Sequence, residues 1–202
     1  MELAIVIPVK RLDEAKSRLA GALDEHNRRT LMQELLEHVA ATAVSAACGP
    51  VWLATSDPAG SAFASDLGVG LLSDGGLAWN QGLEHARQQL DPAPSRVLYL
   101  AGDLPLLTAD EVRELASAAP AKGVVIGRAR DGGTNALVVS PADALVPRFG
   151  EHGSAGVHRY AALAAGLQVV VLDLPGVALD VDTPQDIADA GLELPGTSSR
   201  VR

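Results

Sequence analysis

The sequence has only one cysteine, Cys48, among its 202 residues. A disulfide within the chain is therefore excluded, and such a low cysteine content is typical of proteins from the reducing cytoplasm. Apolar runs that approach the roughly 20 residues of a membrane span are also missing. The opening segment MELAIVIPVK lacks the basic region and the cleavage site of a signal peptide. We therefore predict a cytoplasmic protein with no membrane partner.

Basic charge and aromatic residues are scarce as well. The 16 Lys and Arg residues are outnumbered by 25 Asp and Glu residues, and the net charge is -9 at pH 7. Because binding to nucleic acid needs a basic face, we expect no nucleic-acid partner, although a nucleotide ligand needs only a few local cations. Aromatic residues make up 3% of the chain and hydrophobic residues 48%. A core of Ala, Val, Leu and Ile suits a sheet covered by helices.

The chain does have a regular alternation of strand-like and helix-like segments in its first half. Apolar runs predict strands at 3–9, 49–56, 69–74, 95–103, 123–129, 134–141 and 167–174. Helical spacing and capping residues predict helices at 27–46, 61–68, 77–90, 108–119 and 183–194. This order implies an α/β three-layer sandwich with a mostly parallel, mixed sheet. We predict a single domain over residues 1–195 and a flexible tail at 196–202.

Polar clusters follow several of the predicted strands. They begin at Lys10, Asp57, Asp74 and Asp103. Ligands of parallel α/β sheets bind beyond the carboxyl ends of the strands. We therefore expect the functional site at this edge of the sheet.

The first of these clusters is a basic loop that carries Lys10, Lys16 and Arg18 in an otherwise acidic chain. Cations at this position would neutralise phosphate groups. The alternative is a charged loop that only faces solvent. The chain has neither GxGxxG nor GxxxxGK[ST], so neither a dinucleotide-binding fold nor a P-loop is indicated.

Acidic residues stand at two distant places. Asp103 ends the strand SRVLYLAGD, and Asp180 and Asp182 precede the last predicted helix. Mg²⁺ takes few protein oxygens and completes its shell with water and substrate phosphates, so these acids together suit a magnesium site. The alternative for Asp182 is a helix N-cap, which would explain one acid of the pair but not both.

Two glycine-containing segments supply candidate anion-binding groups. Thr134 follows a glycine turn, and Ser154 follows Gly150 and Gly153 in RFGEHGSAGVHRY. Backbone N–H groups at a helix start, together with a hydroxyl, can bind an anion. The alternative for the first segment is a plain turn. His158 is assigned no proton-transfer role, because a lone histidine is more often a surface or core residue than a catalyst.

Five motifs occur in the order seen in one enzyme family: IPVKRLDEAKSRLAG, AGDLPLL, GGTNAL, RFGEHGSAGVH and LDVDTPQDI. Over nearly its whole length the chain resembles the 2-phospho-L-lactate and phosphoenolpyruvate guanylyltransferases of coenzyme F420 biosynthesis. AGDLPLL and DVDTPQD are shared by many nucleotidyltransferases, whereas PVK…AKSRLA together with GTNAL is more specific. The resemblance implies a glycosyltransferase-A-like nucleotidyltransferase fold. It also implies transfer of GMP from GTP to the phosphate of a small carboxylic acid, with release of pyrophosphate.

The resemblance also implies a cofactor and a nucleoside site. Mg²⁺ would be held by Asp103 and Asp182, with Asp180 nearby. Asp74 and Asn80 would contact the nucleoside, and a carboxylate such as that of Asp74 suits the N–H donors of guanine. The alternative for Asp74-Gly75-Gly76 is a simple turn. The nucleophile is already an anionic phosphate, so no general base is required.

The remaining implied roles concern the acceptor and the charges around it. The acceptor site is implied at Thr134, at Ser154 and at either Gly150 or Gly153, because the chain has an extra residue between Phe149 and Ser154. The implied catalytic residues are Lys10, Lys16, Arg18 and Asp103. The three cations would lower the repulsion between two anionic substrates. Transfer of the unstable product to the next enzyme of the pathway is also implied.

Two other functions stay open at this stage. One is a molybdenum-cofactor-type nucleotidyltransferase on the same fold, although such enzymes begin with a glycine-rich LAGGxSxRMG loop where this chain has IPVKRLDEAKSRLAG. The other is a non-catalytic nucleotide-binding subunit, which the presence of both the acids and the basic loop disfavours. The sequence leaves open whether the acceptor is phospholactate, phosphoenolpyruvate or a close relative.

Overall fold

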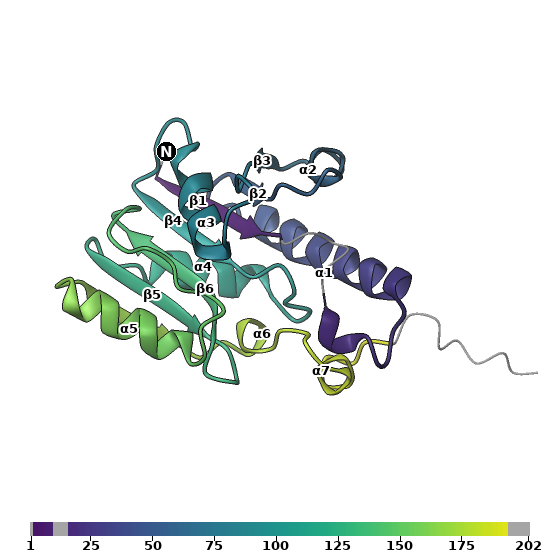
Figure 1. Ribbon diagram of the computed structural model, residues 1–202. Helices are drawn as coiled ribbons and strands as arrows, with labels where there is room; N and C mark the ends of the chain where they lie inside the picture. Colours follow the sequence, from purple (N-terminus) through teal and green to yellow (C-terminus); the bar gives the residue numbers. More distant parts are fainter. Residues whose placement is uncertain (1, 10–15, 194–202) are drawn as a thin grey trace, which may run out of the picture.

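A seven-stranded sheet in the order β3-β2-β1-β4-β6-β5-β7 organises the molecule (Figure 1). The computed structural model describes residues 2–9 and 16–193, so Lys10 and the predicted tail at 196–202 lie outside the described residues. The strands are β1 (Leu3–Pro8), β2 (Val51–Ala54), β3 (Gly70–Leu72), β4 (Arg96–Leu100), β5 (Gly123–Arg128), β6 (Thr134–Ser140) and β7 (Gln168–Leu172). Strand β6 runs antiparallel to both of its neighbours, whereas the other described pairings are parallel. The predicted mostly parallel, mixed sheet is confirmed.

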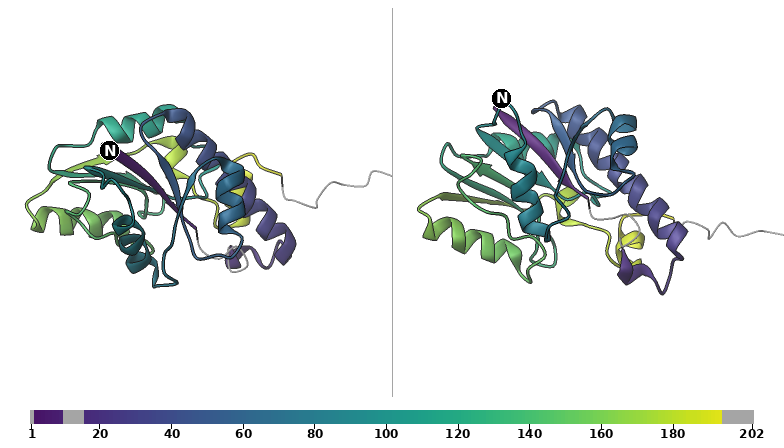
Figure 2. Two further views of the ribbon diagram at one scale, coloured as in Figure 1. Left: turned by 90° about the horizontal axis from the view of Figure 1, so that it is seen from above. Right: turned by 45° about the horizontal axis from the view of Figure 1, so that its top comes forward.

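Helices cover both faces of this sheet. They are η1 (Ser17–Leu19, a 3-10 helix), α1 (Glu25–Ala46), α2 (Gly60–Leu67), α3 (Trp79–Gln88), α4 (Ala109–Ser117), α5 (Ser154–Ala164), α6 (Pro175–Ala178) and α7 (Pro184–Asp189). Helices α1, α2, α4 and α6 pack on one face, and α3 and α5 pack on the other (Figure 2). The predicted three-layer sandwich is confirmed. Within residues 2–9 and 16–193, every helix is too short or too polar to cross a lipid bilayer.

Strand β1 illustrates why an unbroken apolar run predicts a strand that is buried on both faces. All six of its residues are buried. Leu3, Ile5 and Ile7 pack in the core beneath α1, whereas Ala4 and Val6 pack in the core beneath α3 and α5. Successive side chains of a strand point to opposite faces, so a strand covered on both faces needs an unbroken apolar run.

The predicted capping box at the start of α4 is confirmed, and it does more than begin a helix. Thr108 and Glu111 satisfy each other's backbone N–H groups. The second carboxylate oxygen of Glu111 accepts a hydrogen bond of 2.7 Å from the N–H of Gly176, at the start of α6. A Cβ atom on Gly176 would lie 2.3 Å from the carbonyl oxygen of Leu106. Only glycine therefore lets α6 dock against the loop after β4.

A small separate core joins the two ends of the described chain. It consists of Leu19, Leu23, Leu31, Leu35, Val181 and Ile187. These residues belong to η1 and the segment after it, the first turns of α1, and the region of α7. Burial of this cluster brings Lys16 and Arg18 beside the acidic segment at 180–182.

Candidate active site

Three carboxylates from two distant stretches meet at the carboxyl edge of the sheet. Oxygens of Asp103, Asp180 and Asp182 lie within 4.8 Å of one another. Asp103 lies three residues after the end of β4, and its carbonyl oxygen accepts a hydrogen bond of 3.2 Å from the N–H of Val181. This backbone contact joins the two stretches, so the expected meeting of the acids is found in the structure.

Two cations of the basic loop face these acids. The Lys16 ammonium contacts the carboxylate of Asp103 and lies 3.3 Å from an oxygen of Asp182. The Arg18 guanidinium donates to the other oxygen of Asp182 at 2.8 Å. The Lys16 side chain is 6% exposed and that of Arg18 is 74% exposed. The loop therefore places one buried and one exposed positive charge against the acids.

The pKa of Lys16 reflects this position. Burial by itself lowers the pKa of the ammonium, but the Asp103 carboxylate, helped by Asp182, outweighs burial and holds the pKa above its usual 10.5. Lys16 is therefore charged at neutral pH. Its backbone has a φ of 57°, an unusual conformation for a residue with a side chain. Such strain is often found where function fixes a side chain.

Asp180 is a half-buried acid of this group. Burial raises the pKa of its carboxyl group, and the charge of Asp103 raises the pKa further. The Asn135 amide opposes this shift by donating to the carboxylate at 3.1 Å, and it is itself held by the carbonyl of Val177 at 2.9 Å. Three mutually repelling carboxylates of this kind fit a hard divalent cation, which prefers oxygen ligands and relieves the repulsion.

The backbone of the second acidic stretch is held by a buried carboxylate, Asp186, which is 6% exposed. One of its oxygens accepts from the N–H groups of Asp182 and Thr183 at 2.9 and 2.6 Å. Its other oxygen pairs with Arg130. The N-cap of α7 is Thr183 and not Asp182. Capping therefore does not explain Asp182, whose side chain points to Lys16 and Arg18 instead.

A second polar group lies beside the acids, at the start of β6. Thr134 is buried, and its hydroxyl lies 2.9 Å from Nδ1 of His158 on α5. Ser154 is the first residue of α5 and is 2% exposed. The N–H of Ala155 donates to the carbonyl of Gly132 at 3.3 Å, which ties the start of α5 to the turn before β6. The structure thus brings the two predicted acceptor segments together.

The two candidate glycines border this group. Gly153 is the N-cap residue of α5 with a φ of 65°, and Gly150 has a φ of 79°. Both conformations favour glycine because a positive φ is strained for a residue with a side chain, although space for a Cβ atom is open at both positions. Either glycine fits the loop, so the choice between Gly150 and Gly153 stays a prediction.

Of the two predicted nucleoside residues, Asp74 lies in the turn after β3 and Asn80 is the second residue of α3. The Asp74 carboxylate accepts from the N–H of Gly76 at 2.9 Å, which fixes the turn after β3. A Cβ atom on Gly82 would lie 3.0 Å from the Cβ of Asp74, so α3 passes close to this turn. The Asn80 amide is bonded through both of its polar atoms to the backbone of Phe149, in the loop before α5.

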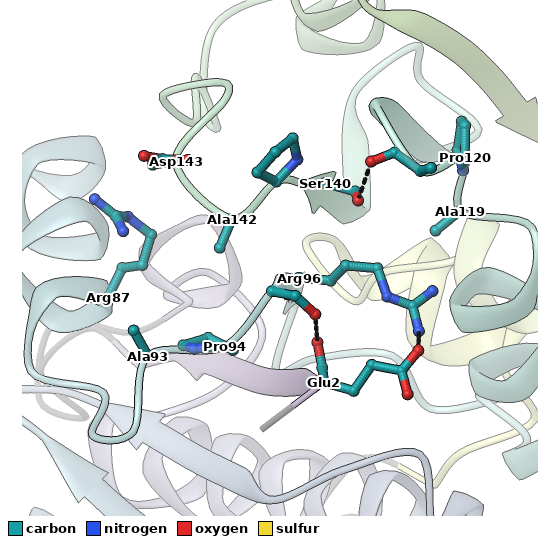
Figure 3. Close-up of a pocket in the computed structure, with 13 residues that line it drawn as sticks. Glu2, Arg87, Ala93, Pro94, Arg96, Ala119, Pro120, Ser140, Ala142 and Asp143 are labelled. Atoms are coloured by element: carbon teal, nitrogen blue, oxygen red, sulfur yellow. Dashed lines mark hydrogen bonds and ion pairs between the residues drawn. The ribbon is translucent and has the colours of Figure 1, made fainter.

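A cavity of about 570 Å³ lies at the opposite end of the sheet (Figure 3). It is lined by Glu2 before β1, Arg96 at the start of β4 and Ser140 at the end of β6. Arg96 donates to the carboxylate of Glu2 at 2.8 Å, and Ser140 donates to the carbonyl of Ala121 at 3.0 Å. These polar groups already satisfy one another or the backbone. The cavity is remote from the acids and is not assigned to the site.

Three supporting residues were not assigned roles from the sequence. Asn135 and Asp186 hold Asp180 and the backbone of Asp182, and His158 holds Thr134. A signal existed for Asp186, because a Thr followed three residues later by an acid is typical of a capping box. For Asn135 and His158 the partners are 45 and 24 residues away in the chain, and no local pattern points to them.

The sheet and its flanking helices have the fold of solved nucleotidyl transferases. A solved structure of a nucleotidyl transferase from Methanothermobacter thermautotrophicus is similar to this chain, with a TM-score of 0.66 and 14% sequence identity. The similarity covers 93% of this chain and 95% of that chain. At this level of identity it demonstrates a shared fold.

Sequence comparison specifies the family. The family model "Guanylyl transferase CofC like" matches residues 3–200, and the chain belongs to this family. The phosphoenolpyruvate guanylyltransferase of Sphaerobacter thermophilus is 39% identical over 204 residues, covering 98% of both chains. The 2-phospho-L-lactate guanylyltransferase of Methanothermobacter thermautotrophicus is 33% identical over 201 residues, covering 99% of this chain and 89% of that one. The resemblance inferred from the motifs is confirmed, and the match favours a guanylyltransferase over the two alternative functions.

Proposed function

We propose that this enzyme transfers GMP from GTP to the phosphate of phosphoenolpyruvate or 2-phospho-L-lactate in coenzyme F420 biosynthesis and releases pyrophosphate. The observation that carries the proposal is the meeting of Asp103, Asp180 and Asp182 opposite the cations of the basic loop. The names of the relatives supply the substrate class. The reducing cytoplasm is the proposed setting, and transfer of the product to the following enzyme is part of the same proposal.

Asp103, Asp180 and Asp182 would hold Mg²⁺. A bound divalent ion neutralises phosphate charge and helps to orient the two reactants. The chain's own contribution is to fix the ligands: Asn135 orients Asp180, and Asp186 fixes the backbone of Asp182. Phosphoryl-type transfer depends on positioning and electrostatics more than on covalent chemistry.

The basic loop supplies positive charge toward the triphosphate. Lys16 and Arg18 face Asp182, and Lys10 is assigned to the same loop from the sequence alone. Two anionic substrates repel each other, so cations fixed at their meeting point stabilise the charge that is shared in the transition state. The ammonium of Lys16 is buried enough for this attraction to be weakly screened.

The acceptor would bind at Thr134, Ser154 and one of the two glycines, Gly150 or Gly153. The hydroxyl groups of Thr134 and Ser154 suit a phosphate or a carboxylate, whereas the N–H groups of Ala155, Gly156 and Val157 already donate to carbonyl oxygens. The nucleoside would bind near Asp74 and Asn80, on the other side of the same edge. A carboxylate at Asp74 suits the N1–H and N2 donors of guanine, a donor pattern that adenine lacks.

The test of the proposed function is product analysis by mass spectrometry. The enzyme is incubated with GTP and Mg²⁺, with phosphoenolpyruvate, 2-phospho-L-lactate and 3-phosphoglycerate offered together. We expect a guanosine diphosphate-linked product of one of the first two acids, with pyrophosphate in equal amount. EDTA is expected to abolish the product. If none of these acids gives a guanylylated product, the proposal is refuted.

Replacing Ser154 by Ala is expected to raise KM for the acceptor about tenfold and to leave KM for GTP within about twofold. One hydrogen bond to a charged group accounts for a change of this size. Steady-state kinetics with each substrate varied in turn measures both constants. Ser117→Ala, on the outside of α4, is the control and is expected to change neither. A rise in KM for GTP alone would move Ser154 out of the acceptor site.

A further inference from the structure

Two consecutive residues, Arg148 and Phe149, form a short strap that is held on two sides. The strap lies immediately before Gly150, Gly153 and Ser154, which are the candidate acceptor residues. Its backbone follows no helix or strand. Its position must therefore come from contacts with other elements.

The first contact comes from α3. Nδ2 of Asn80 donates to the carbonyl of Phe149 at 3.1 Å, and Oδ1 of Asn80 accepts from the N–H of Phe149 at 2.8 Å. One amide side chain thus satisfies both backbone groups of one residue, much as a neighbouring strand would. An exposed loop residue has no need of such a pair, because water can serve the same groups.

The second contact comes from α5. His158 is fully buried, and its Nε2 accepts from the N–H of Arg148 at 2.8 Å. An Nε2 that accepts a hydrogen bond carries no proton, so the hydrogen of the neutral ring is on Nδ1. Burial, with a smaller effect of the Arg148 charge, outweighs a hydrogen bond to the Ser154 backbone and lowers the pKa of His158 to about 4, so the ring is neutral at pH 7.

The position of that hydrogen determines what Thr134 does. Nδ1–H of His158 faces the Thr134 hydroxyl oxygen at 2.9 Å, so the hydroxyl acts as an acceptor in this contact. The hydroxyl hydrogen of Thr134 is then left to be donated elsewhere. An anionic acceptor needs donors of this kind.

The ring of Phe149 anchors the strap to the core. It meets His158 edge to face at a centroid distance of 5.3 Å and Tyr99 at 6.3 Å, with interplanar angles of 66° and 67°. Such edge-to-face pairs add to the energy of apolar burial. The strap is therefore fixed by its backbone and by its side chain.

We propose that Asn80 and His158 are positioning residues that hold the Arg148–Phe149 strap and orient the Thr134 hydroxyl, and thereby shape the acceptor site. This inference rests on the proposed function for the identity of the acceptor. It gives Asn80 a role that differs from the nucleoside contact predicted from the sequence. Because Asn80 lies on α3 beside the Asp74 turn, it also joins the nucleoside side of the site to the acceptor side.

Two substitutions of His158 each remove one of its two hydrogen bonds and keep the other. Gln places its amide near the position of Nε2, so His158→Gln keeps an acceptor for Arg148 and loses the donor to Thr134. Asn places its amide near the position of Nδ1, so His158→Asn keeps the donor to Thr134 and releases Arg148. Asn80→Leu removes both bonds to Phe149 at similar volume. The control is His26→Asn, at the exposed start of α1.

Amide hydrogen exchange tests the hold on the strap without any substrate. We expect exchange at Arg148 to be about tenfold faster in His158→Asn than in His158→Gln, and exchange at Phe149 to be about tenfold faster in Asn80→Leu than in the wild type. The proposal is overturned if the exchange rates at Arg148 and at Phe149 are the same in all variants and in the control.

Kinetics tests the link to the acceptor. Both His158 variants are expected to raise KM for phosphoenolpyruvate or phospholactate about tenfold, with KM for GTP within about twofold of the wild type. Asn80→Leu is expected to raise KM for the acceptor about tenfold as well, and, because Asn80 is also placed near the nucleoside, KM for GTP is not used to judge this variant. Equal increases in both KM values in the His158 variants, or a loss of kcat alone, would overturn the proposal. If the wild-type enzyme uses neither acid, the proposed function is refuted, and the role of the two residues in acceptor binding is refuted with it. The exchange experiment still decides in that case whether Asn80 and His158 hold the strap.

Discussion

Replacing Asp103 by Asn is expected to lower turnover about a thousandfold and to leave the fold intact. Asp103 is the acid that contacts Lys16 and also faces Asp180 and Asp182. The amide keeps the size of the side chain but removes one negative charge and one ligand oxygen. A divalent cation loses affinity for the site, and Lys16 loses its nearest counter-charge.

Stability is expected to change little in Asp103→Asn, because two effects oppose each other. The ion pair with Lys16 is lost, but the repulsion that raises the pKa of Asp180 is relieved. We expect a thermal midpoint within about 4 °C of the wild type. Activity, metal binding by calorimetry and thermal unfolding are measured on the same preparation.

The control for this experiment is Asp143→Asn, an exposed carboxylate at the opposite end of the sheet. It removes the same charge from the chain without touching the acids at the carboxyl edge. Full activity in Asp103→Asn would exclude Asp103 from the catalytic site. A large loss of activity in Asp143→Asn would show that net charge, and not the metal ligand, accounts for the effect.

The fold could be predicted from the sequence because each signal was local. The apolar run of β1 is buried on both faces, and the capping box at Thr108 begins α4 where expected. The last helix is shorter than predicted, since α7 ends at Asp189 and a left-handed Gly191 follows. A glycine in this conformation commonly ends a helix, so that signal was also present.

The site was predictable where residues stand directly at strand ends, as Asp103 and Thr134 do. The antiparallel direction of β6 puts its first residues, not its last, at the same edge as the end of β4, where Leu100 pairs with Ala136. The supporting contacts were not predictable, because Asn135 to Asp180 and Asn80 to Phe149 join residues 45 and 69 positions apart. Only the tertiary fold defines such pairs.

The largest expected effect on stability is that of Asp186→Ala. The buried Asp186 carboxylate accepts from the N–H groups of Asp182 and Thr183 and from the hydroxyl of Thr183, and it pairs with Arg130. Alanine removes this buried partner from all of these donors, although Thr183 and Arg130 are themselves exposed. We expect the free energy of unfolding to fall by about 3 kcal/mol.

The same substitution is expected to lower turnover, although Asp186 is not among the three metal-ligand candidates. Its two backbone bonds fix the direction in which Asp182 leaves the chain, and supporting residues of metal sites typically contribute about 10- to 100-fold to activity or metal affinity. Chemical denaturation and kinetics in the presence of saturating Mg²⁺ measure the two effects separately.

Asp189→Ala is the matched control, because Asp189 lies on the same helix and pairs with the same Arg130, at 2.6 Å, but does not bond to residues 182–183. An exposed ion pair of this kind contributes little to stability. If Asp189→Ala lowers turnover as much as Asp186→Ala, the effect comes from Arg130 and not from the backbone of Asp182. If only Asp186→Ala does so, the position of Asp182 depends on a carboxylate that touches neither the metal nor the substrate.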